Sequence, residues 1–203
     1  MSKEKQNIQK PSHLEDERLI NDFQADKTVA FDKLVIKYTD KVFNLCYRLL
    51  GDYDEANDCA QETFIKVFRN LQKFKFKSSF STWLYTIATN TCKNRLSSLE
   101  YRSNKKTVRI NNPVGTEEIG KTLEISDNSF NPEAKFERKE REKIIQNAID
   151  TLPQNQKMLI ILRDVEGKSY EEIVEITGLR PGTVKSKLAR ARHHLRGLLR
   201  GAI

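Results

Sequence analysis

Apolar residues recur every three or four positions through most of the chain, which is the spacing of side chains along one helix face. Outside the middle segment, no sustained alternation of apolar and polar residues indicates a β-strand. Glycine, proline and polar clusters interrupt the helical spacing and set the helix ends. The pattern predicts an all-α fold. The expected helices cover residues 15–25, 28–50, 52–71, 80–97, 132–150 and 154–165, and a helix pair lies within 169–199.

Three of these helices carry apolar stripes that should form the core of an amino-terminal bundle. The helix over 28–50 turns inward Phe31, Leu34, Val35, Tyr38, Val42, Leu45, Cys46 and Leu49. The helix over 52–71 contributes Ala56, Cys59, Ala60, Phe64, Val67, Phe68 and Leu71. The helix over 80–97 contributes Phe80, Leu84, Ile87, Ala88 and Thr91. Together these stripes permit a core of modest size.

The stretch from Ser169 to Leu199 has the signals of a helix-turn-helix. Ser169 and Glu172 form a capping-box pattern, in which each side chain satisfies a backbone N–H at the helix start. Gly178 can adopt the left-handed conformation that ends a helix, and Pro181 fits the first turn of the next one. The sequence therefore predicts two helices joined by a tight turn.

The second helix of this pair combines an apolar stripe with a basic outer side. The stripe consists of Val184, Leu188, Ala191, Leu195 and Leu198. No acidic residue occurs between Arg180 and Arg200. A basic run alone is typical of a solvated helix, but together with the cap, the turn and the stripe it favours a recognition helix in the DNA major groove. The candidate DNA-binding residues are Thr183, Lys185, Ser186, Lys187, Arg190 and Arg192.

A middle segment with scattered Asn, Pro and Gly and no sustained amphipathic pattern separates two helical units. A chain of 203 residues with 37% hydrophobic content also suits two small domains. We predict an amino-terminal domain over residues 14–98, a flexible linker over 99–134 and a carboxy-terminal domain over 135–203.

The charge and the cysteines restrict partners and location. A net charge of +8 favours a polyanionic partner, of which nucleic acid is the leading candidate. No apolar run approaches the roughly 20 residues needed to cross a bilayer. Residues 1–10 are polar and lack a signal-peptide core, so we predict a cytoplasmic protein without membrane insertion.

Cys46, Cys59 and Cys92 are widely spaced without a histidine cluster, which predicts small buried residues and neither a disulfide framework nor a zinc site.

The loop and helix from Phe74 to Asn94 mix aromatic, amide and basic side chains. Unpaired bases stack on aromatic rings, amides hydrogen-bond to base edges and lysines follow the phosphate backbone. Packing in the core is the alternative role for Phe80 and Trp83. The candidates for contact with unpaired DNA are Phe74, Lys75, Lys77, Asn90, Lys93 and Asn94.

The helix that begins after Asp52 is acidic opposite its apolar stripe. Asp52 and Glu55 form a second capping-box pattern. The helix dipole favours carboxylates in the first turn, but this effect fades before Asp58 and Glu62. In a chain this basic, the acidic side is a candidate protein-docking surface. It consists of Asp54, Glu55, Asp58, Gln61 and Glu62.

No Gly-rich phosphate loop, metalloprotease pattern or nucleophile elbow occurs, so neither an enzymatic activity nor a cofactor is predicted. Two other function classes stay open. A dimeric helix-turn-helix regulator accounts for residues 169–199 equally well, but not for the aromatic and acidic surfaces. A nucleic-acid-processing enzyme would need a metal or nucleophile set, which the sequence does not show.

The segments described above resemble those of a bacterial sigma factor of the extracytoplasmic-function (ECF) group, within the sigma-70 family. Phe31 to Phe74, above all Asp54 to Phe64, resembles the part of region 2 that binds core polymerase. Phe80 to Asn90 resembles the promoter-melting segment, and Leu152 to Arg192 resembles region 4. The resemblance covers most of the chain outside the first residues and the linker.

The resemblance implies a transcription factor that directs RNA polymerase core to promoters and melts them. The acidic side would face the clamp helices of the largest polymerase subunit, and the flap would be a second polymerase contact. Phe74, Asn90 and Asn94 would meet flipped or unpaired bases of the minus-ten element. The residues that would read the minus-thirty-five element are Lys185, Ser186 and Arg190.

Three further expectations concern the complex. Two weak DNA readers on one linker gain effective concentration when polymerase holds both, so neither needs high affinity alone. Members of the family are commonly held inactive by an anti-sigma factor on the polymerase-binding surfaces, which implies such a partner here. Asn57 stands where an acidic residue is usual in the family, which weakens the implied clamp contact.

Overall fold

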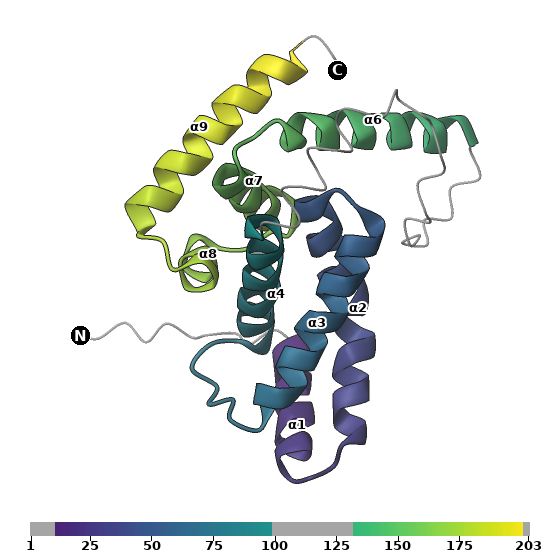
Figure 1. Ribbon diagram of the computed structural model, residues 1–203, viewed down its shortest axis with the longest axis vertical. Helices are drawn as coiled ribbons and strands as arrows, with labels where there is room; N and C mark the ends of the chain where they lie inside the picture. Colours follow the sequence, from purple (N-terminus) through teal and green to yellow (C-terminus); the bar gives the residue numbers. More distant parts are fainter. Residues whose placement is uncertain (1–10, 99–131, 201–203) are drawn as a thin grey trace.

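The structure is a computed structural model that describes residues 11–98 and 132–200, and every regular element in these ranges is a helix. The all-α prediction is therefore confirmed. An amino-terminal bundle contains α1 (Pro11–Gln24), α2 (Val29–Leu50), α3 (Tyr53–Leu71) and α4 (Phe80–Ser97) (Figure 1). The second half contains α6 (Pro132–Asp150), α7 (Gln154–Ile160), the π-helix η1 (Ile161–Val165), α8 (Tyr170–Thr177) and α9 (Pro181–Leu199). Residues 99–131 of the predicted linker lie outside the described residues, and its last three belong to α6.

The helices of the bundle begin and end where local chemistry favours it. The Asp52 carboxylate accepts a hydrogen bond from the backbone N–H of Glu55 at 2.9 Å, which caps α3. Ser79 caps α4 through the N–H of Thr82 at 3.1 Å. Gly51 ends α2 with φ of 74°, a left-handed conformation that a residue with a side chain adopts only under strain.

The core largely follows the predicted stripes, since α2 packs against α3 and α4 through side chains that are almost fully buried. Two predicted core residues are wrong. Phe68 of α3 is 47% exposed and Leu198 of α9 is 46% exposed. Phe68 contacts the Phe23 and Phe31 rings and leaves the rest of its own ring in solvent, whereas Leu198 lies in the last turn of α9. Val35 is only half-buried on α2.

A buried polar contact fixes α1 across α2. Asp16 is 4% exposed, and its carboxylate accepts hydrogen bonds from the Tyr38 hydroxyl at 2.6 Å and the Lys37 ammonium at 2.8 Å. At the other end of α1, the Gln24 amide donates to the carbonyl oxygens of Leu71 and Phe74 at 3.1 and 3.0 Å. These bonds satisfy carbonyls at the end of α3 and hold the start of the loop that leads to α4.

The three cysteines are buried, as predicted. Cys46, Cys59 and Cys92 come from α2, α3 and α4, and each is 0% exposed. A hydrogen bond to Cys92, and then burial, raise the pKa of the Cys59 thiol. A hydrogen bond to Cys46 likewise raises the pKa of the Cys92 thiol. Because the thiolate is the reactive form, these groups are poor nucleophiles in the folded chain.

We expect the folded protein to react only slowly with a thiol reagent such as dithionitrobenzoate at about pH 8, since burial and the raised pKa both suppress thiolate attack. In guanidinium chloride, all three thiols should react at the rate of free cysteine. The time course of absorbance measures both rates. One thiol that reacts rapidly in the native protein would contradict the buried placement.

The predicted helix-turn-helix is present at α8 and α9. Ser169 and Glu172 make both bonds of the capping box, at 3.1 and 2.8 Å. Gly178 ends α8 with φ of 68°, and Pro181 occupies the first turn of α9. The helix predicted over 154–165 is α7, but its last turn widens into the π-helix η1.

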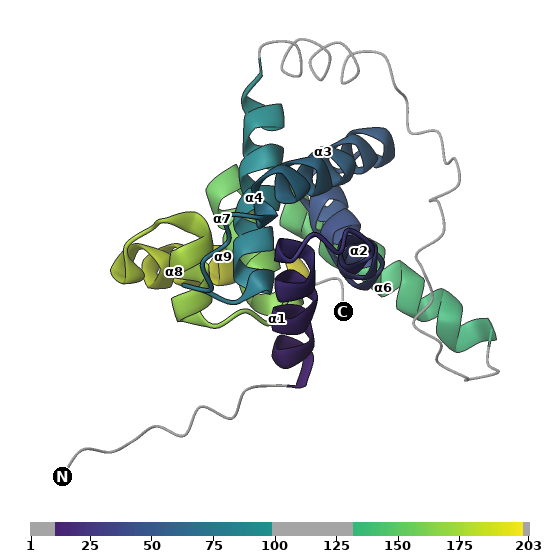
Figure 2. The same ribbon diagram turned by 90° about the horizontal axis from the view of Figure 1, so that it is seen from below.

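The two halves of the structure pack against each other. Two views at right angles both place α8 beside α4 (Figures 1 and 2), and α7 and η1 also contact α2. Within residues 11–98 and 132–200, no helix has the length and apolar character needed to cross a bilayer.

Candidate DNA-binding and docking surfaces

The outer side of α9 is open to solvent. Val184, Leu188 and Ala191 are buried against the rest of the second half, so the opposite side of the helix faces outward. Of the predicted DNA-binding residues, Lys185, Ser186 and Arg190 are exposed, whereas Thr183 and Lys187 are half-buried. The exposed set forms one basic surface with the length and polarity that major-groove contact requires.

Arg192 differs from the other predicted residues of α9 because its guanidinium is already paired. Its Nε and Nη2 atoms contact the Asp164 carboxylate at 3.1 and 2.5 Å. This pair raises the pKa of Arg192 and ties α9 to η1. The ion pair indicates that Arg192 positions the recognition helix, while the exposed residues of α9 remain available to a ligand.

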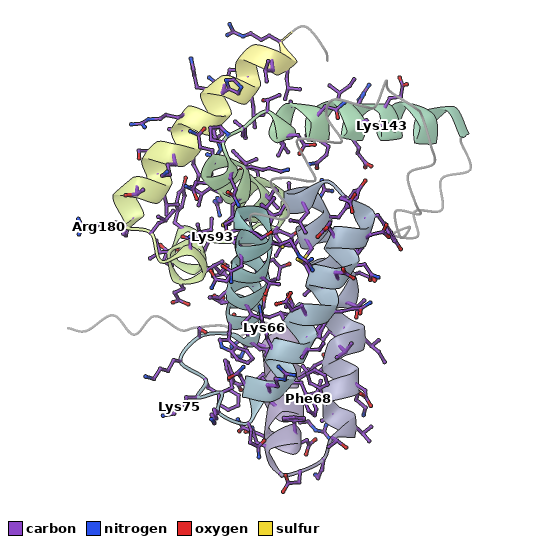
Figure 3. The ribbon with its side chains drawn as sticks, viewed as in Figure 1. Lys66, Phe68, Lys75, Lys93, Lys143 and Arg180 are labelled. Carbon is purple, nitrogen blue, oxygen red and sulfur yellow. The ribbon has the colours of Figure 1, made fainter. Side chains whose placement is uncertain are left out.

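The loop between α3 and α4 buries its first aromatic residue and exposes its lysines. Phe74 is only 9% exposed and packs against Phe76, Phe80 and Trp83, with ring centroids 4.9 Å apart for the Trp83 pair. Its ring cannot stack on a base without leaving this cluster. Lys75 and Lys77 are exposed. Figure 3 shows Lys75 on this loop, pointing away from the bundle.

A pocket of about 310 Å³ opens between α3 and α4. Lys66 lies at its edge, where the ammonium group contacts the Thr91 hydroxyl at 3.0 Å and the Glu62 carboxylate at 2.7 Å. The half-buried indole of Trp83 supplies an aromatic wall, and exposed Asn90 supplies an amide. The residues around the pocket are Lys66, Asn70, Trp83, Ile87, Asn90 and Thr91.

The remaining predicted residues of α4 extend the surface beyond this pocket. Lys93 and Asn94 are exposed on the turn after Asn90. Figure 3 shows Lys66 and Lys93 on the adjoining helices α3 and α4. The structure thus brings together Asn90, Lys93 and Asn94 with an aromatic ring and a second lysine. Lys66 and Asn70 are functional candidates that the sequence pattern does not reveal, because the polar side of α3 reads as a protein-docking surface.

The acidic side of α3 is continuous but not uniformly free. Asp54, Asp58 and Gln61 are exposed, and Glu62 is half-buried. Glu55 does not complete the predicted capping box. Its Oε2 atom lies 3.3 Å from the Nε atom of Arg95 on α4 and is buried without a hydrogen bond.

Arg95 reaches a second carboxylate of this side, since its Nη2 atom lies 3.8 Å from Asp58. Cys59 and the two carboxylates raise the pKa of Arg95, although its partial burial opposes this shift. Glu55 is therefore an internal partner of α4. The exposed acidic surface consists of Asp54, Asp58 and Gln61, with the half-buried Glu62 at its edge.

Two apolar side chains extend the acidic surface toward the end of α3. Ile65 and Phe68 are 50% and 47% exposed, and they follow Asp58 and Gln61 on the same helix face. The Phe68 ring makes edge contacts with the rings of Phe23 and Phe31, with centroids 5.5 and 5.0 Å apart, and these contacts fix its orientation (Figure 3). A surface with an apolar centre and a charged rim is typical of a protein interface.

Metal binding has no candidate among the residues that the structure describes. No group of three or more His, Cys, Asp or Glu side chains there is arranged to hold a metal ion.

Two family descriptions match the chain: Sigma-70 region 2 over residues 34–102, and Sigma-70 region 4 over residues 142–195. The RNA polymerase sigma-H factor of Pseudomonas aeruginosa is 37% identical over 178 residues, which cover 88% of this chain and 90% of that protein. The ECF RNA polymerase sigma-E factor of Escherichia coli (strain K12) is 38% identical over 179 residues, covering 88% and 91% of the two chains.

Solved structures show the same fold. The structure of CnrH in complex with the cytosolic domain of CnrY aligns with a TM-score of 0.62 and 19% identity, covering 93% of this chain and 99% of that one. The sigma factor RpoE of Bartonella quintana, solved with the anti-sigma factor NepR, aligns with a TM-score of 0.60 and 24% identity, covering 85% and 98%.

Proposed function

Because this chain belongs to the sigma-70 family and to its ECF group, we propose specific roles for its surfaces in promoter recognition and opening. As a sigma factor, it directs RNA polymerase core to promoters and initiates transcription there. We assign core binding and minus-ten melting to residues 14–98, and minus-thirty-five recognition to residues 135–203, with residues 99–134 as the linker. The observation that carries the minus-ten assignment is the pocket between α3 and α4.

The pocket is the proposed receptor for an unpaired base of the minus-ten element. Its volume of about 310 Å³ lies at the lower end of the range for ligand sites. The Trp83 ring can stack on a base, the Asn90 amide can bond to a base edge, and Lys66 can contact the adjoining phosphate. Such contacts offset the few kcal/mol that base extrusion costs.

Around the pocket, exposed lysines guide the single strand. Lys75 and Lys77 lie on the loop before α4, and Lys93 lies beyond Asn90. Their charges attract the phosphate backbone without reading sequence. Asn94 adds a second amide for a neighbouring base. Phe74 acts indirectly in this proposal, because it supports the Trp83 ring from below.

On α9, Lys185, Ser186 and Arg190 are the proposed readers of the minus-thirty-five element. They lie on the exposed side of the second helix of a helix-turn-helix, which is the element that enters the major groove in this motif. Thr183 and Lys187 flank them, and Arg192 holds the helix at its angle through Asp164.

The exposed acidic surface of α3, together with Ile65 and Phe68, is the proposed docking site for the clamp helices of the largest polymerase subunit. The apolar side chains would bury their surface against the partner. The carboxylates would orient the partner and raise the association rate. The flap is the proposed second polymerase contact of the carboxy-terminal domain. An anti-sigma factor that covers these surfaces is the proposed inhibitor; the related RpoE was solved with such a partner.

Neutralising Asp58 and Glu62 (Asp58→Asn with Glu62→Gln) should weaken core-polymerase binding about 2- to 30-fold, since two exposed ion pairs contribute about 0.2–1 kcal/mol each. The loss should shrink as salt rises. Fluorescence titration of labelled protein with core polymerase measures it. The control neutralises exposed Asp32 and Asp40 of α2 in the same way. An equal loss in both variants would indicate a general charge effect and contradict this docking site.

Run-off transcription with core polymerase on a genomic promoter library tests the function as a whole. Addition of the purified chain should produce a defined set of start sites that core polymerase alone does not produce. The protein would act in the cytoplasm with polymerase and without catalysis of its own. A dimer that binds a palindromic operator and does not associate with core polymerase would support the regulator alternative instead.

A further inference from the structure

The side-chain amide of Gln24, the last residue of α1, is bonded to the end of α3 and to the loop that follows it. Its Nε2 atom donates to the carbonyl oxygens of Leu71 and Phe74 at 3.1 and 3.0 Å. The Gln72 amide donates back to the Gln24 carbonyl at 3.1 Å. Figure 1 shows α1 beside this end of α3, where the loop to α4 begins. The start of the loop is therefore held by a residue 50 positions away from Phe74 in the sequence.

This bond takes the place of a common way of ending a helix. The helices α2 and α8 end at Gly51 and Gly178, whose left-handed conformations turn the chain and satisfy carbonyls of the last turn. No glycine ends α3, and Gln72 at its end keeps a right-handed helical conformation. The carbonyls of the last turn of α3 need donors from elsewhere. Gln24 supplies one, so the direction in which the chain leaves α3 depends on α1.

The ring of Phe74 connects this fixed point to the pocket between α3 and α4. Its centroid lies 4.9 Å from that of Trp83 and 6.3 Å from that of Phe80. Trp83 is half-buried and borders the pocket. A series of direct contacts thus leads from the Gln24 amide through Phe74 to the aromatic wall of the pocket. Because the interior is close-packed, a shift of the Phe74 backbone would displace the Trp83 ring or leave a gap beside it.

The middle of the loop has a strained backbone, which indicates that its path is imposed from both sides. Phe76 has φ of 54°, a left-handed conformation that a bulky residue adopts only under strain. Such strain persists where the surrounding structure fixes the chain. A hydrogen bond holds the loop at Phe74, and Ser79 holds it again as the cap of α4. The exposed side chains of Lys75 and Lys77 lie between these two points, so their placement depends on both.

On the basis of the proposed role of the pocket, we infer that Gln24 is a positioning residue for minus-ten recognition. It sets the backbone of the loop and, through Phe74, the place of the Trp83 ring. A base that stacks on a displaced ring no longer meets the Asn90 amide in register. Gln24 acts without contacting DNA, because carbonyls of the protein occupy its amide. Core-polymerase binding should be spared, since the carboxylates of the docking surface lie in the amino-terminal half of α3.

Fluorescence of Trp83, the single tryptophan of the chain, tests this role in the free protein. Gln24→Leu removes the amide donors at similar volume, so the emission should shift to longer wavelength and quenching by acrylamide should increase. Gln24→Lys restores N–H donors within reach of the same carbonyls and should return both values towards wild type. The control is Asn21→Leu, at an exposed position of α1. Wild-type emission and quenching in Gln24→Leu would overturn the inference.

A second test measures base discrimination by the assembled holoenzyme on promoter DNA with a pre-melted minus-ten bubble. Gln24→Leu should reduce discrimination at one minus-ten position at least about fivefold, the lower limit for a base-edge contact. Discrimination at the minus-thirty-five element should stay at the wild-type value. Gln24→Lys should recover the minus-ten discrimination, whereas its charge alone would raise affinity for every sequence alike. Equal losses at both elements and in core-polymerase binding would indicate a damaged bundle and overturn the positioning role.

The remaining outcomes separate this inference from the proposed function. A displaced Trp83 ring with wild-type discrimination would make Gln24 a structural residue only and would overturn the inference. A wild-type holoenzyme without base preference in the minus-ten element would instead contradict the proposed function, and Trp83 fluorescence would still decide whether Gln24 sets the loop. If Gln24→Leu does not fold, Gln24→Asn keeps the amide one methylene short of the carbonyls. It should show both losses, and wild-type values would overturn the inference.

Discussion

Replacing Asn90 and Lys93 by alanine should reduce open-complex formation about 10- to 100-fold while leaving core-polymerase binding intact. Asn90 borders the pocket between α3 and α4, and Lys93 lies one turn away on the same exposed surface. A polar contact to a base edge contributes about 1–3 kcal/mol, and loss of a phosphate contact adds to that. Because neither side chain is buried, the folded bundle should be unaffected.

Permanganate reactivity of promoter thymines measures this effect, since only unpaired thymines react. The matched control replaces Asn44 and Lys33, which are exposed on α2 away from the pocket. Reactivity equal to wild type in the Asn90 and Lys93 variant would contradict the proposed base capture. Equal losses in transcription and core-polymerase binding would point to a damaged bundle, which thermal unfolding of the same variant would reveal.

Two single substitutions distinguish the roles of Trp83 and Asn90 on this surface. Trp83→Phe keeps an aromatic wall and should retain most base stacking, whereas Asn90→Ala removes the amide that can distinguish bases. The first change should therefore lower the stability of the open complex on all promoters alike. The second should change which base is preferred at one minus-ten position.

Local signals in the sequence were sufficient for the helix-turn-helix. Each signal depends only on residues within about one helical turn: the capping box of Ser169 and Glu172, the helix end at Gly178 and the helix start at Pro181. The structure contains each feature at the predicted residue. The same holds for the boundaries of α2 and α3, where Gly51 and Asp52 lie side by side. Capping and turn chemistry depend on neighbours in sequence, so a single chain shows them directly.

Contacts between distant residues were not accessible in this way. Glu55 and Arg192 looked like free surface charges, but each is paired with a residue of another helix, Arg95 and Asp164. Phe74 lies in a polar loop, and only the folded structure shows that its ring belongs to an aromatic cluster. Helical periodicity reports which face is apolar, but it does not report which partner reaches a charge.

The contact of Tyr85 with Glu166 has the same origin, because these residues are 81 positions apart. From the sequence, Tyr85 was one of several aromatic residues beside a basic loop. In the structure it is buried under α8, while its neighbour Trp83 borders the open pocket. Two aromatic side chains on one helix thus serve different purposes, because residues two positions apart point to nearly opposite sides of α4.

Substitution of Arg190 by alanine should reduce discrimination at one position of the minus-thirty-five element by about 1–3 kcal/mol, which corresponds to about 5- to 150-fold. Arg190 is exposed on α9, whereas Arg192 is paired with Asp164, so Arg190 has the free guanidinium fork that a guanine edge requires. Arg190→Lys keeps the charge but loses the bidentate geometry. It should therefore retain affinity for arbitrary duplex and still lose discrimination.

Competition between duplexes that differ at single positions, all at one salt concentration, separates base reading from charge. If Arg190 contacts a base, the alanine variant loses affinity for the preferred duplex but not for duplexes changed at that position. Exposed Arg196, further along α9, is the matched control and should affect all duplexes equally. A uniform loss for Arg190→Ala, with a salt dependence reduced by about one phosphate contact, would assign this residue to the backbone instead. Sequence reading by α9 would then depend on Lys185 and Ser186, which lie one turn closer to its amino terminus.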